Sequence, residues 1–367
     1  MNMTSTLAIS ASLLAMLTAT VASAQSMDDL VAAATAEGQL TTIALPHDWC
    51  GYGAVIEGFK AKYPGITVNE LSPDAGSADE LEAIRANRDN TGPQTPDVID
   101  VGLAFGPQAQ EEGLIQPYKV ATWDTIPDSA KDADGYWYGD YYGVMAFAVN
   151  TDMVTNLPAD WADLMKPEYA NAFALSGDPR SGNQSMMSLM SAGMAMGAEP
   201  GAASGEAGLK FLADLNAAGN FVPVAGKTGT IAQGQTPIVA AWDYNLLAWR
   251  DALAGNPPVE VYVPTSGTVA GVYVQAISAF APHPNAAKLW MEYLYSDEGQ
   301  LGWLAGYCHP IRFNDMVARG IVPQDMLDAL PPAASYEAAV FPTLEQQSAH
   351  KEVVTAGWDA VVGLTVE

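Results

Sequence analysis

The sequence predicts an α/β fold divided into two lobes. Strand and helix patterns alternate from residue 39 to 101, and a second alternating pattern covers 173–242. Two apolar strands, expected at 143–150 and 271–280, can cross between these regions without a flexible linker. The length of 367 residues is enough for two cores of ordinary domain size. With 49 % hydrophobic and 16 % charged residues, the composition is that of a globular protein.

The first alternating pattern begins after a short amphipathic helix, which is expected over 27–37 and ends at Gly38. Strands and helices then alternate, with expected bounds of 39–45, 54–63, 66–71, 78–87 and 97–101. This β-α-β-α-β order favours a mainly parallel sheet.

The second pattern lies between the crossing strands. Its expected elements are a strand at 173–175, a helix from about 183, a helix at 207–218, and strands at 238–242 and 259–263. We therefore expect a first lobe that begins with 25–142, a second lobe at 143–270, and a segment 271–367 that returns to the first lobe and carries the C-terminal helices. A paired crossover of this kind allows closure about a hinge.

The first 24 residues differ from the rest of the chain. They contain no Asp, Glu, Lys or Arg, and an apolar run extends from Leu7 to about Val21. The run is shorter than the ~20 apolar residues that span a bilayer comfortably. Ala22-Ser23-Ala24 has the small residues of a signal-peptidase site, although a basic n-region is missing. We expect a signal peptide cleaved after Ala24 and export to the periplasm; an uncleaved anchor or a different start codon is the alternative.

The formal net charge of −27 lies entirely outside that segment. Nucleic acids and anionic lipid surfaces require basic patches, so both are excluded as partners. An acidic surface often reflects solubility alone, and it also favours cationic or amine-bearing ligands. The composition leaves both interpretations open.

The chain has two cysteines, Cys50 and Cys308. In an exported protein an isolated pair forms a disulfide more often than two free thiols. The expected bond would tie the first strand–loop unit to a segment near the C-terminus.

Several short segments, in this order, carry a family resemblance. They are a strand–loop–helix unit at 47–63 ending in Y-P-G-I-T-V, P-D-V-I-D-V at 96–101, G-D-Y-Y-G-V-M-A-F-A-V-N at 139–150, W-A-D-L with K-P-E-Y at 161–169, and H-P-N-A-A-K-L-W-M-E-Y-L-Y-S-D-E-G-Q at 283–300. Together they resemble the family 1 extracellular solute-binding proteins, which include ferric-iron, thiamine and spermidine/putrescine receptors. The resemblance implies a type II periplasmic-binding fold with a ligand cleft between the lobes. It also implies a monomer without cofactor or catalysis that delivers a small solute to an ABC permease in the inner membrane.

Polyamine receptors of this family have an aromatic pair after the first strand and a Trp/Asp pair in the second lobe. The similar positions here are Trp49 with Tyr52, and Trp242 with Asp243. An ammonium group gains about 0.5–2 kcal/mol over an aromatic face, and a carboxylate fixes its position. Asp48 could supply a second carboxylate. Core packing is the alternative role for each tryptophan.

An anion site is also expected, because Arg180 and Ser181 precede a helix whose N-terminus attracts negative charge. Lys227 and Thr228 are weaker candidates for the same anion, and the alternative is an ordinary N-cap beside a solvated Arg180. The predicted ligand is therefore an amine-bearing solute, either polyamine-like or a zwitterion such as an ω-amino acid or aminophosphonate. A phosphorylated sugar is the next candidate. The remaining candidate site residues lie at loop ends or near the return crossing, and they are His47, Ser77, Phe105 and Tyr273.

Two other functions are less well supported. Ferric iron needs several phenolate and carboxylate ligands, and Tyr244 beside Asp243 is a thin set. The adjacent Tyr141-Tyr142 pair fits hinge packing better, and the four histidines lack metal-ligand spacing, so no metal site is expected. A penicillin-recognising serine enzyme would use S-x-x-K, S-x-N and K-T-G. Those motifs occur at 348–351, 181–183 and 227–229, in the wrong chain order.

Overall fold

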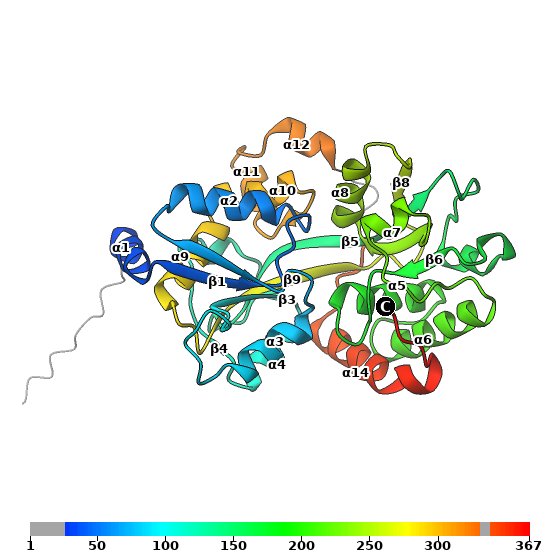
Figure 1. Cartoon of the computed structure of the whole chain (residues 1–367), viewed down its shortest axis with the longest axis horizontal. Coiled ribbons are helices and arrows are strands. Elements are labelled where there is room, and N and C mark those ends of the chain that lie inside the picture. The colour runs from blue at the N-terminus through cyan, green and yellow to red at the C-terminus, as the bar shows by residue number, and fades with distance from the viewer. Residues whose placement is uncertain (1–25, 331–337) are drawn as a thin grey trace, which may run out of the picture.

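The computed structural model describes residues 26–330 and 338–367 and consists of two lobes side by side (Figure 1). The predicted signal peptide, residues 1–24, lies outside the described residues. Two long strands, β5 (Tyr138–Asn150) and β9 (Ala270–Ser278), run from one lobe into the other. None of the helices in the described ranges is both long enough and apolar enough to span a membrane.

The first lobe is built from the first third of the chain. Its elements are α1 (Met27–Glu37), β1 (Gln39–Ile43), α2 (Tyr52–Lys62), β2 (Thr67–Leu71), α3 (Ser77–Ala86), β3 (Val98–Gly102), α4 (Phe105–Glu111) and β4 (Ile115–Gln116), followed by the short 3₁₀ turns η1 (Trp123–Thr125) and η2 (Asp128–Ala130). As predicted, α1 ends at Gly38, which has the left-handed φ of 71° that favours glycine.

The prediction of a mainly parallel sheet is wrong for the larger sheet. β1 and β2 are parallel, but β3 pairs antiparallel with β9, and β5 pairs antiparallel with β9 and with β7 (Ile238–Trp242). The reason is that β9 returns from the second lobe and inserts beside β3, so it runs against the strands of the first lobe. The fold remains α/β with two lobes, as expected.

The second lobe lies between the crossing strands. Its elements are η3 (Trp161–Met165), η4 (Pro167–Tyr169), β6 (Phe173–Leu175), α5 (Asn183–Ala195), α6 (Ala202–Ala217), α7 (Thr228–Ala232), β7, α8 (Asp243–Leu253) and β8 (Val259–Tyr262). β5 pairs with β9 over Tyr138–Val144 and with β7 from Met145 onward, so one strand belongs to the sheets of both lobes.

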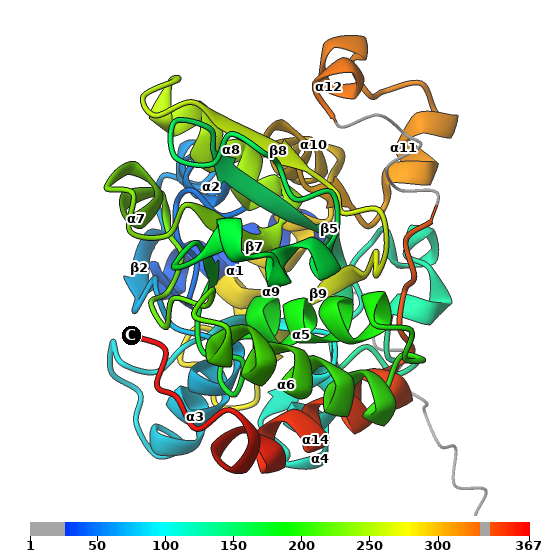
Figure 2. The same ribbon diagram turned by 90° about the vertical axis from the view of Figure 1, so that its right-hand side faces the viewer.

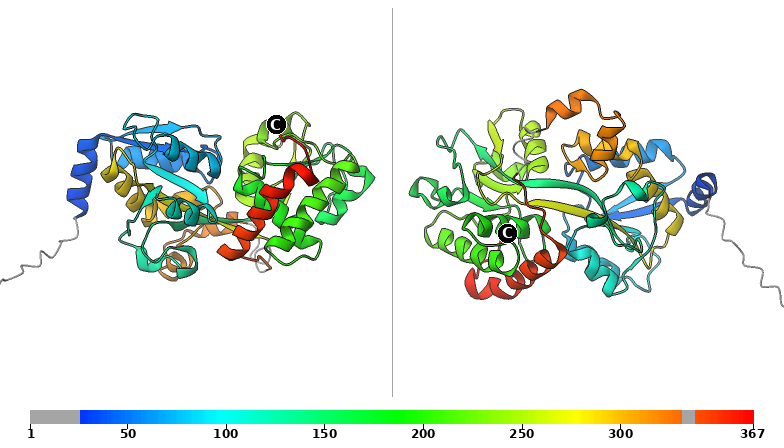
Figure 3. Two further views of the ribbon diagram at one scale, coloured as in Figure 1. Left: turned by 90° about the horizontal axis from the view of Figure 1, so that it is seen from below. Right: turned by 180° about the vertical axis from the view of Figure 1, so that it is seen from behind.

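The last part of the chain contributes to both lobes. Its elements are α9 (Pro284–Leu294), α10 (Asp297–Ala305), β10 (His309–Pro310), α11 (Phe313–Ala318), α12 (Gln324–Ala329) and α14 (Leu344–Val361). α9 packs against α1 and α10 packs against α2, in the first lobe. α14 instead lies along α6 of the second lobe (Figures 2 and 3). Buried His350 explains this position, because its ring nitrogens contact Ser204 Oγ at 3.2 Å and the Met186 carbonyl at 3.0 Å.

The predicted disulfide is confirmed: Cys50 is bonded to Cys308 across a sequence separation of 258 residues. Both cysteines are fully buried. The bond joins the loop before α2 to the segment after α10, and both belong to the first lobe. It therefore fastens the returning chain to the loop that follows β1.

We expect reduction of this bond to lower the stability of the first lobe. A disulfide that closes a long loop typically contributes about 2–5 kcal/mol, because it restricts the unfolded chain. The melting temperature should fall by several degrees when reductant is added. Calorimetry would measure this, with a Cys50→Ser/Cys308→Ser variant as control, whose melting temperature should not respond to reductant. An unchanged melting temperature in wild-type protein with two titrated thiols would contradict the expectation.

Candidate ligand-binding cleft

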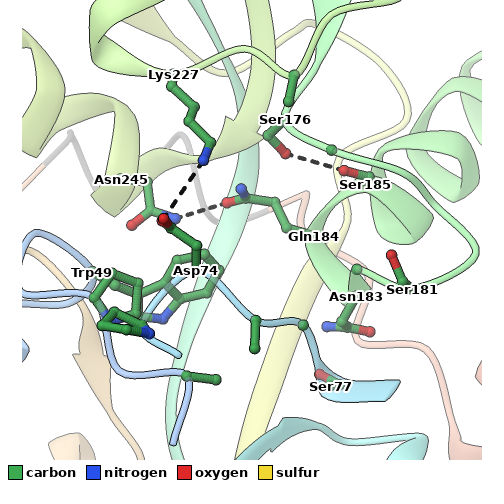
Figure 4. A pocket seen from close by; sticks show the side chains of 18 of the residues that line it. Trp49, Asp74, Ser77, Ser176, Ser181, Asn183, Gln184, Ser185, Lys227 and Asn245 are labelled. Carbon is green, nitrogen blue, oxygen red and sulfur yellow. Dashed lines mark hydrogen bonds and ion pairs between the residues drawn. The ribbon is translucent and has the colours of Figure 1, made fainter. Parts of the chain in front are cut away.

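A cavity of about 470 Å³ lies between the two lobes, within the range of small-molecule sites. The first lobe contributes the loops after β1 and β2, the start of α3 and part of β3. The second lobe contributes the loop after β6, the starts of α5 and α7, and α8 (Figure 4). Loops at strand ends and helix N-termini converge here, which is where open α/β sheets bind ligands.

Five of the predicted site residues line this cavity: Asp48, Trp49, Ser77, Ser181 and Tyr273. The weaker candidates Lys227 and Thr228 line it as well.

The indole of Trp49 is held in place by aromatic neighbours. Its Nε1–H donates to the Tyr141 hydroxyl at 2.7 Å, and its ring makes edge contacts with Tyr244 and Tyr273, at centroid distances of 5.6 and 5.4 Å. The side chain is half-buried and borders the cavity. It therefore offers a fixed aromatic surface to a ligand.

Three predicted residues of the first lobe lie away from the cavity. His47 is exposed and pairs with Glu70 at 2.6 Å. Tyr52 is fully buried, where its hydroxyl donates to Asp100 Oδ2 at 2.8 Å. Phe105 is a core residue at the start of α4, and the Lys351 ammonium lies 3.4 Å from its ring centroid.

The Trp242-Asp243 pair does not line the cavity either. Trp242 is fully buried, and its Nε1 lies 3.5 Å from the Tyr273 hydroxyl, so Tyr273 stands next to it on the cavity wall. Asp243 Oδ1 accepts from the Val144 backbone N–H at 2.9 Å, at the point where β5 passes between the lobes. This pair therefore lies beside the hinge strand.

Arg180 also points away from the cavity. Its guanidinium pairs with Asp178 at 2.6 Å and with Asp359 of α14 at 2.9 Å. These two carboxylates hold the side chain beside the last helix. The neighbouring Ser181, by contrast, lines the cavity.

Three amide side chains of the second lobe were missed by sequence reasoning. Asn183, Gln184 and Asn245 are buried and line the cavity. Gln184 Oε1 accepts from the Trp242 backbone N–H at 3.0 Å and from Asn245 Nδ2 at 2.8 Å (Figure 4). This arrangement fixes the Asn245 amide and leaves its Oδ1 buried without a hydrogen-bond partner among the described residues.

Two carboxyls of the first lobe were also missed. Glu80 of α3 and Asp100 of β3 line the cavity, although they are only 1 % and 6 % exposed. Burial raises the pKa of Glu80 well above its usual value and that of Asp100 to about 6. A signal was present in the sequence: Asp100 interrupts an apolar strand, V-I-D-V-G, where a carboxyl is costly without a role.

The cavity is strongly acidic. Its lining contains the carboxyls of Asp48, Asp74, Asp79, Glu80, Asp100 and Asp178, against the single ammonium of Lys227. All except Asp178 belong to the first lobe. The second-lobe wall offers mainly hydroxyls, amides and the start of α5, which no side chain caps. The first-lobe wall thus favours a positively charged group, and the second-lobe wall favours a negatively charged one.

The lobes touch each other around this cavity. Lys227 of the second lobe reaches Asp74 of the first at 3.6 Å (Figure 4). The Ala78 backbone N–H donates to the Ser181 carbonyl at 3.5 Å. On α8, Asp251 accepts from the hydroxyl of Tyr307, which follows α10. The two lobes are therefore in direct contact on either side of the cavity.

No group of three or more His, Cys, Asp or Glu side chains suited to a metal ion is found in ranges 26–330 and 338–367. Of the three motifs expected for a serine enzyme, Ser181 and Lys227 border the cavity, whereas Ser348 is exposed on α14. The structure thus does not bring the three motifs together.

Comparison with known proteins finds a family and relatives that this chain resembles. The model of the family described as bacterial extracellular solute-binding protein matches residues 93–333. An uncharacterized protein of Haemophilus influenzae is 29 % identical over 247 residues, which are 63 % of this chain and 66 % of that protein. A candidate 2-aminoethylphosphonate-binding periplasmic protein of Salmonella typhimurium is 26 % identical over 247 residues, 65 % of this chain and 67 % of that protein. The chain thus spans about two thirds of the length of these relatives.

Among solved structures, the periplasmic binding protein AgtB of A. tumefaciens in complex with agropinic acid aligns with a TM-score of 0.70. Its sequence identity is 17 %, and the alignment covers 89 % of this chain and 99 % of AgtB. Such a similarity reflects the shared two-lobed fold. Together with the family match over most of the chain, it identifies the protein as a member of the bacterial extracellular solute-binding protein family.

Proposed function

We propose that the protein is a periplasmic receptor that captures a small amine-bearing solute and delivers it to the permease of an ABC importer. The observation that carries this proposal is the excess of carboxyls in the cavity lining, where Asp178 and Asp74 pair with Arg180 and Lys227. The other four carboxyls, those of Asp48, Asp79, Glu80 and Asp100, form no ion pair among the described residues. A cationic group on the ligand would compensate this excess, and Trp49 offers an aromatic face beside it.

The second-lobe wall favours a zwitterion over a simple polyamine. The hydroxyls of Ser181, Ser185 and Thr228 and the ammonium of Lys227 line this wall near the uncapped start of α5. A helix start, hydroxyl groups and a cation are the usual partners of a carboxylate or phosphonate. An ω-amino acid or an aminophosphonate would place its amine toward the first lobe and its acid group toward the second.

The relative from Salmonella typhimurium supports this assignment, because its name gives an aminophosphonate as the solute. The absence of Arg180 from the wall weakens the alternative of a phosphorylated sugar, since a dianionic phosphate usually recruits an arginine. The acidic lining opposes that ligand as well.

A ligand screen tests the ligand class. We expect 2-aminoethylphosphonate or 4-aminobutyrate to raise the melting temperature of protein stripped of bound solute, since a ligand at about 100 times its Kd adds about 2.7 kcal/mol. Differential scanning fluorimetry would compare them with putrescine, ethylphosphonate, fructose 6-phosphate and ferric citrate. A shift with ethylphosphonate equal to that with its amine analogue would contradict the amine requirement. If only ferric citrate or fructose 6-phosphate raised the melting temperature, the protein would be a receptor for a different ligand and the amine assignment would be wrong.

Trp49 should contribute to amine binding through its ring face. We expect Trp49→Ala to weaken binding of the amine ligand by about 2- to 30-fold, the equivalent of the ~0.5–2 kcal/mol of a cation–π contact. Trp49→Phe keeps an aromatic face and should retain most of the affinity, as measured by calorimetric titration. Equal losses in both variants would indicate that the hydrogen bond to Tyr141, not the ring face, is what matters.

Lobe closure can be tested at Gly76. A Cβ at this position would lie 2.8 Å from the Ser181 carbonyl oxygen of the other lobe. The φ of −104° suits any residue, so Gly76→Ala strains only the closed form. We expect ligand affinity to fall by about tenfold or more, because binding and closure are coupled. The melting temperature of the unliganded Gly76→Ala variant should stay close to that of wild-type protein, because the open form is not strained. If the variant bound ligand as tightly as wild-type protein, the lobes would not need to approach this closely.

A further inference from the structure

Three carboxyls are stacked behind the first-lobe wall of the cavity. Glu80 and Asp100 line the wall, and Asp140 of β5 lies deeper, with no exposed surface. Glu80 Oε2 accepts from the Asp100 backbone N–H at 2.9 Å. Asp100 and Asp140 repel each other electrostatically, and Asp100 Oδ1 is buried without a hydrogen-bond partner among the described residues.

The groups around these carboxyls are neutral or acidic. Asp100 Oδ2 accepts from the hydroxyls of Tyr52 and Tyr141, at 2.8 and 2.7 Å, and Asp140 Oδ2 accepts from Gln275 Nε2 at 3.0 Å. The other groups that act on the cluster electrostatically are Asp79 of α3, Tyr244 of α8, Tyr273 of β9 and Tyr295 after α9. Across the described ranges, none of the three carboxyls forms an ion pair.

Buried carboxylates without a counter-ion are unstable, so they either hold protons or receive a cation. Burial and mutual repulsion raise the pKa of Glu80 and of Asp140 well above the usual range. Protons therefore occupy this cluster while the cavity lacks a cation. Glu80 and Asp100 line the cavity with only 1 % and 6 % of their surface exposed, so a cationic ligand in the cavity would lie against the wall that holds them.

The second lobe supplies an independent sign of a hydrogen-bond donor on the ligand. Asn245 is 1 % exposed, and Gln184 fixes its amide so that Oδ1 remains a buried acceptor without a partner among the described residues. Such an oxygen needs an N–H or O–H group. An amine-bearing ligand in the cavity carries donors of this kind.

We infer that the ammonium group of the ligand binds at Glu80 and Asp100 and displaces a proton that these carboxyls hold in the unliganded protein. The proton leaves to solvent, and the ammonium takes its place as the counter-charge. This inference rests on the proposed function, because it requires an amine-bearing ligand. It adds that amine capture is coupled to pH and assigns the coupling to two residues.

The direction of the pH effect follows from this exchange. At low pH the carboxyls hold their protons, and the ammonium must displace one. Affinity should therefore rise with pH between about 5 and 7, by up to about tenfold per pH unit for one proton released. The probe 4-aminobutyrate suits this range, because a simple amine and a simple carboxyl titrate near about 10 and 4.

Calorimetric titration in two buffers of different ionisation enthalpy counts the protons released. We expect wild-type protein to release up to about one proton per 4-aminobutyrate at pH 6. Glu80→Gln should release fewer protons and bind at least about tenfold more weakly at pH 7. The matched control is Glu82→Gln, the same change at an exposed position on the same helix, which should behave like wild type.

The outcomes separate this inference from the proposed function. Amine binding without proton release, with equal affinity in Glu80→Gln, would overturn the exchange and leave the amine receptor intact. Binding only of ligands without an amine would overturn both. The proton count on wild-type protein decides the question even if a variant fails to fold.

Discussion

Of the two strands that connect the lobes, β5 is the one with a carboxyl behind the cavity wall. β5 pairs with β9 over its first half and with β7 over its second half, so it continues through both sheets. Asp140 and Tyr141, on the first half, lie under the carboxyls of the cavity wall. Val144, a few residues later, donates to Asp243 of the second lobe. The strand that connects the lobes therefore also passes behind the first-lobe wall of the cavity.

The buried carboxyls behind the cavity wall differ from other buried charged side chains, because they have no partner of opposite charge in the part of the chain that the structure describes. Elsewhere, buried Asp97 accepts from the ring and backbone of His283. Buried Arg312 donates to Thr125, to the Tyr295 carbonyl and to the carboxylate of Asp315. Behind the first-lobe wall, neutral hydroxyls and amides satisfy the hydrogen bonds of three carboxyls but supply no opposite charge. Folding tolerates such groups where a ligand can supply that charge.

Much of the fold could be predicted from the sequence because its elements carry local signals. The strands β6 and β7 have the predicted bounds, and α5 begins at Asn183 as expected, since turn residues precede it and apolar runs mark the strands. The direction of pairing could not be predicted, because no local pattern shows that β9 inserts beside β3. Pairing between strands this far apart in the chain is decided by the global topology.

The site was predicted less completely, for reasons that individual residues illustrate. Trp49 was found because loops at strand ends border clefts, and this rule depends only on local order. Glu80 was passed over as part of a charged helix, although it lies four residues before buried Ile84, on the face that packs against the sheet. Arg180 was misleading because Asp178 and the distant Asp359 of α14 hold its guanidinium, and Phe105 because its ring is packed in the core of the first lobe.

The first residues of α8 explain how a ligand contact can act on the hinge. Asp243 holds the backbone of β5, and Asn245, two residues later on the same helix, faces the cavity. Gln184 of α5 links Trp242 and Asn245, since its Oε1 accepts from the Trp242 backbone N–H and from Asn245 Nδ2. The residue that contacts β5 and the residue that lines the cavity are therefore two positions apart on one helix. Asp243 of the Trp-Asp pair thus joins the second lobe to β5, and Asn245, two residues further along α8, lines the cavity.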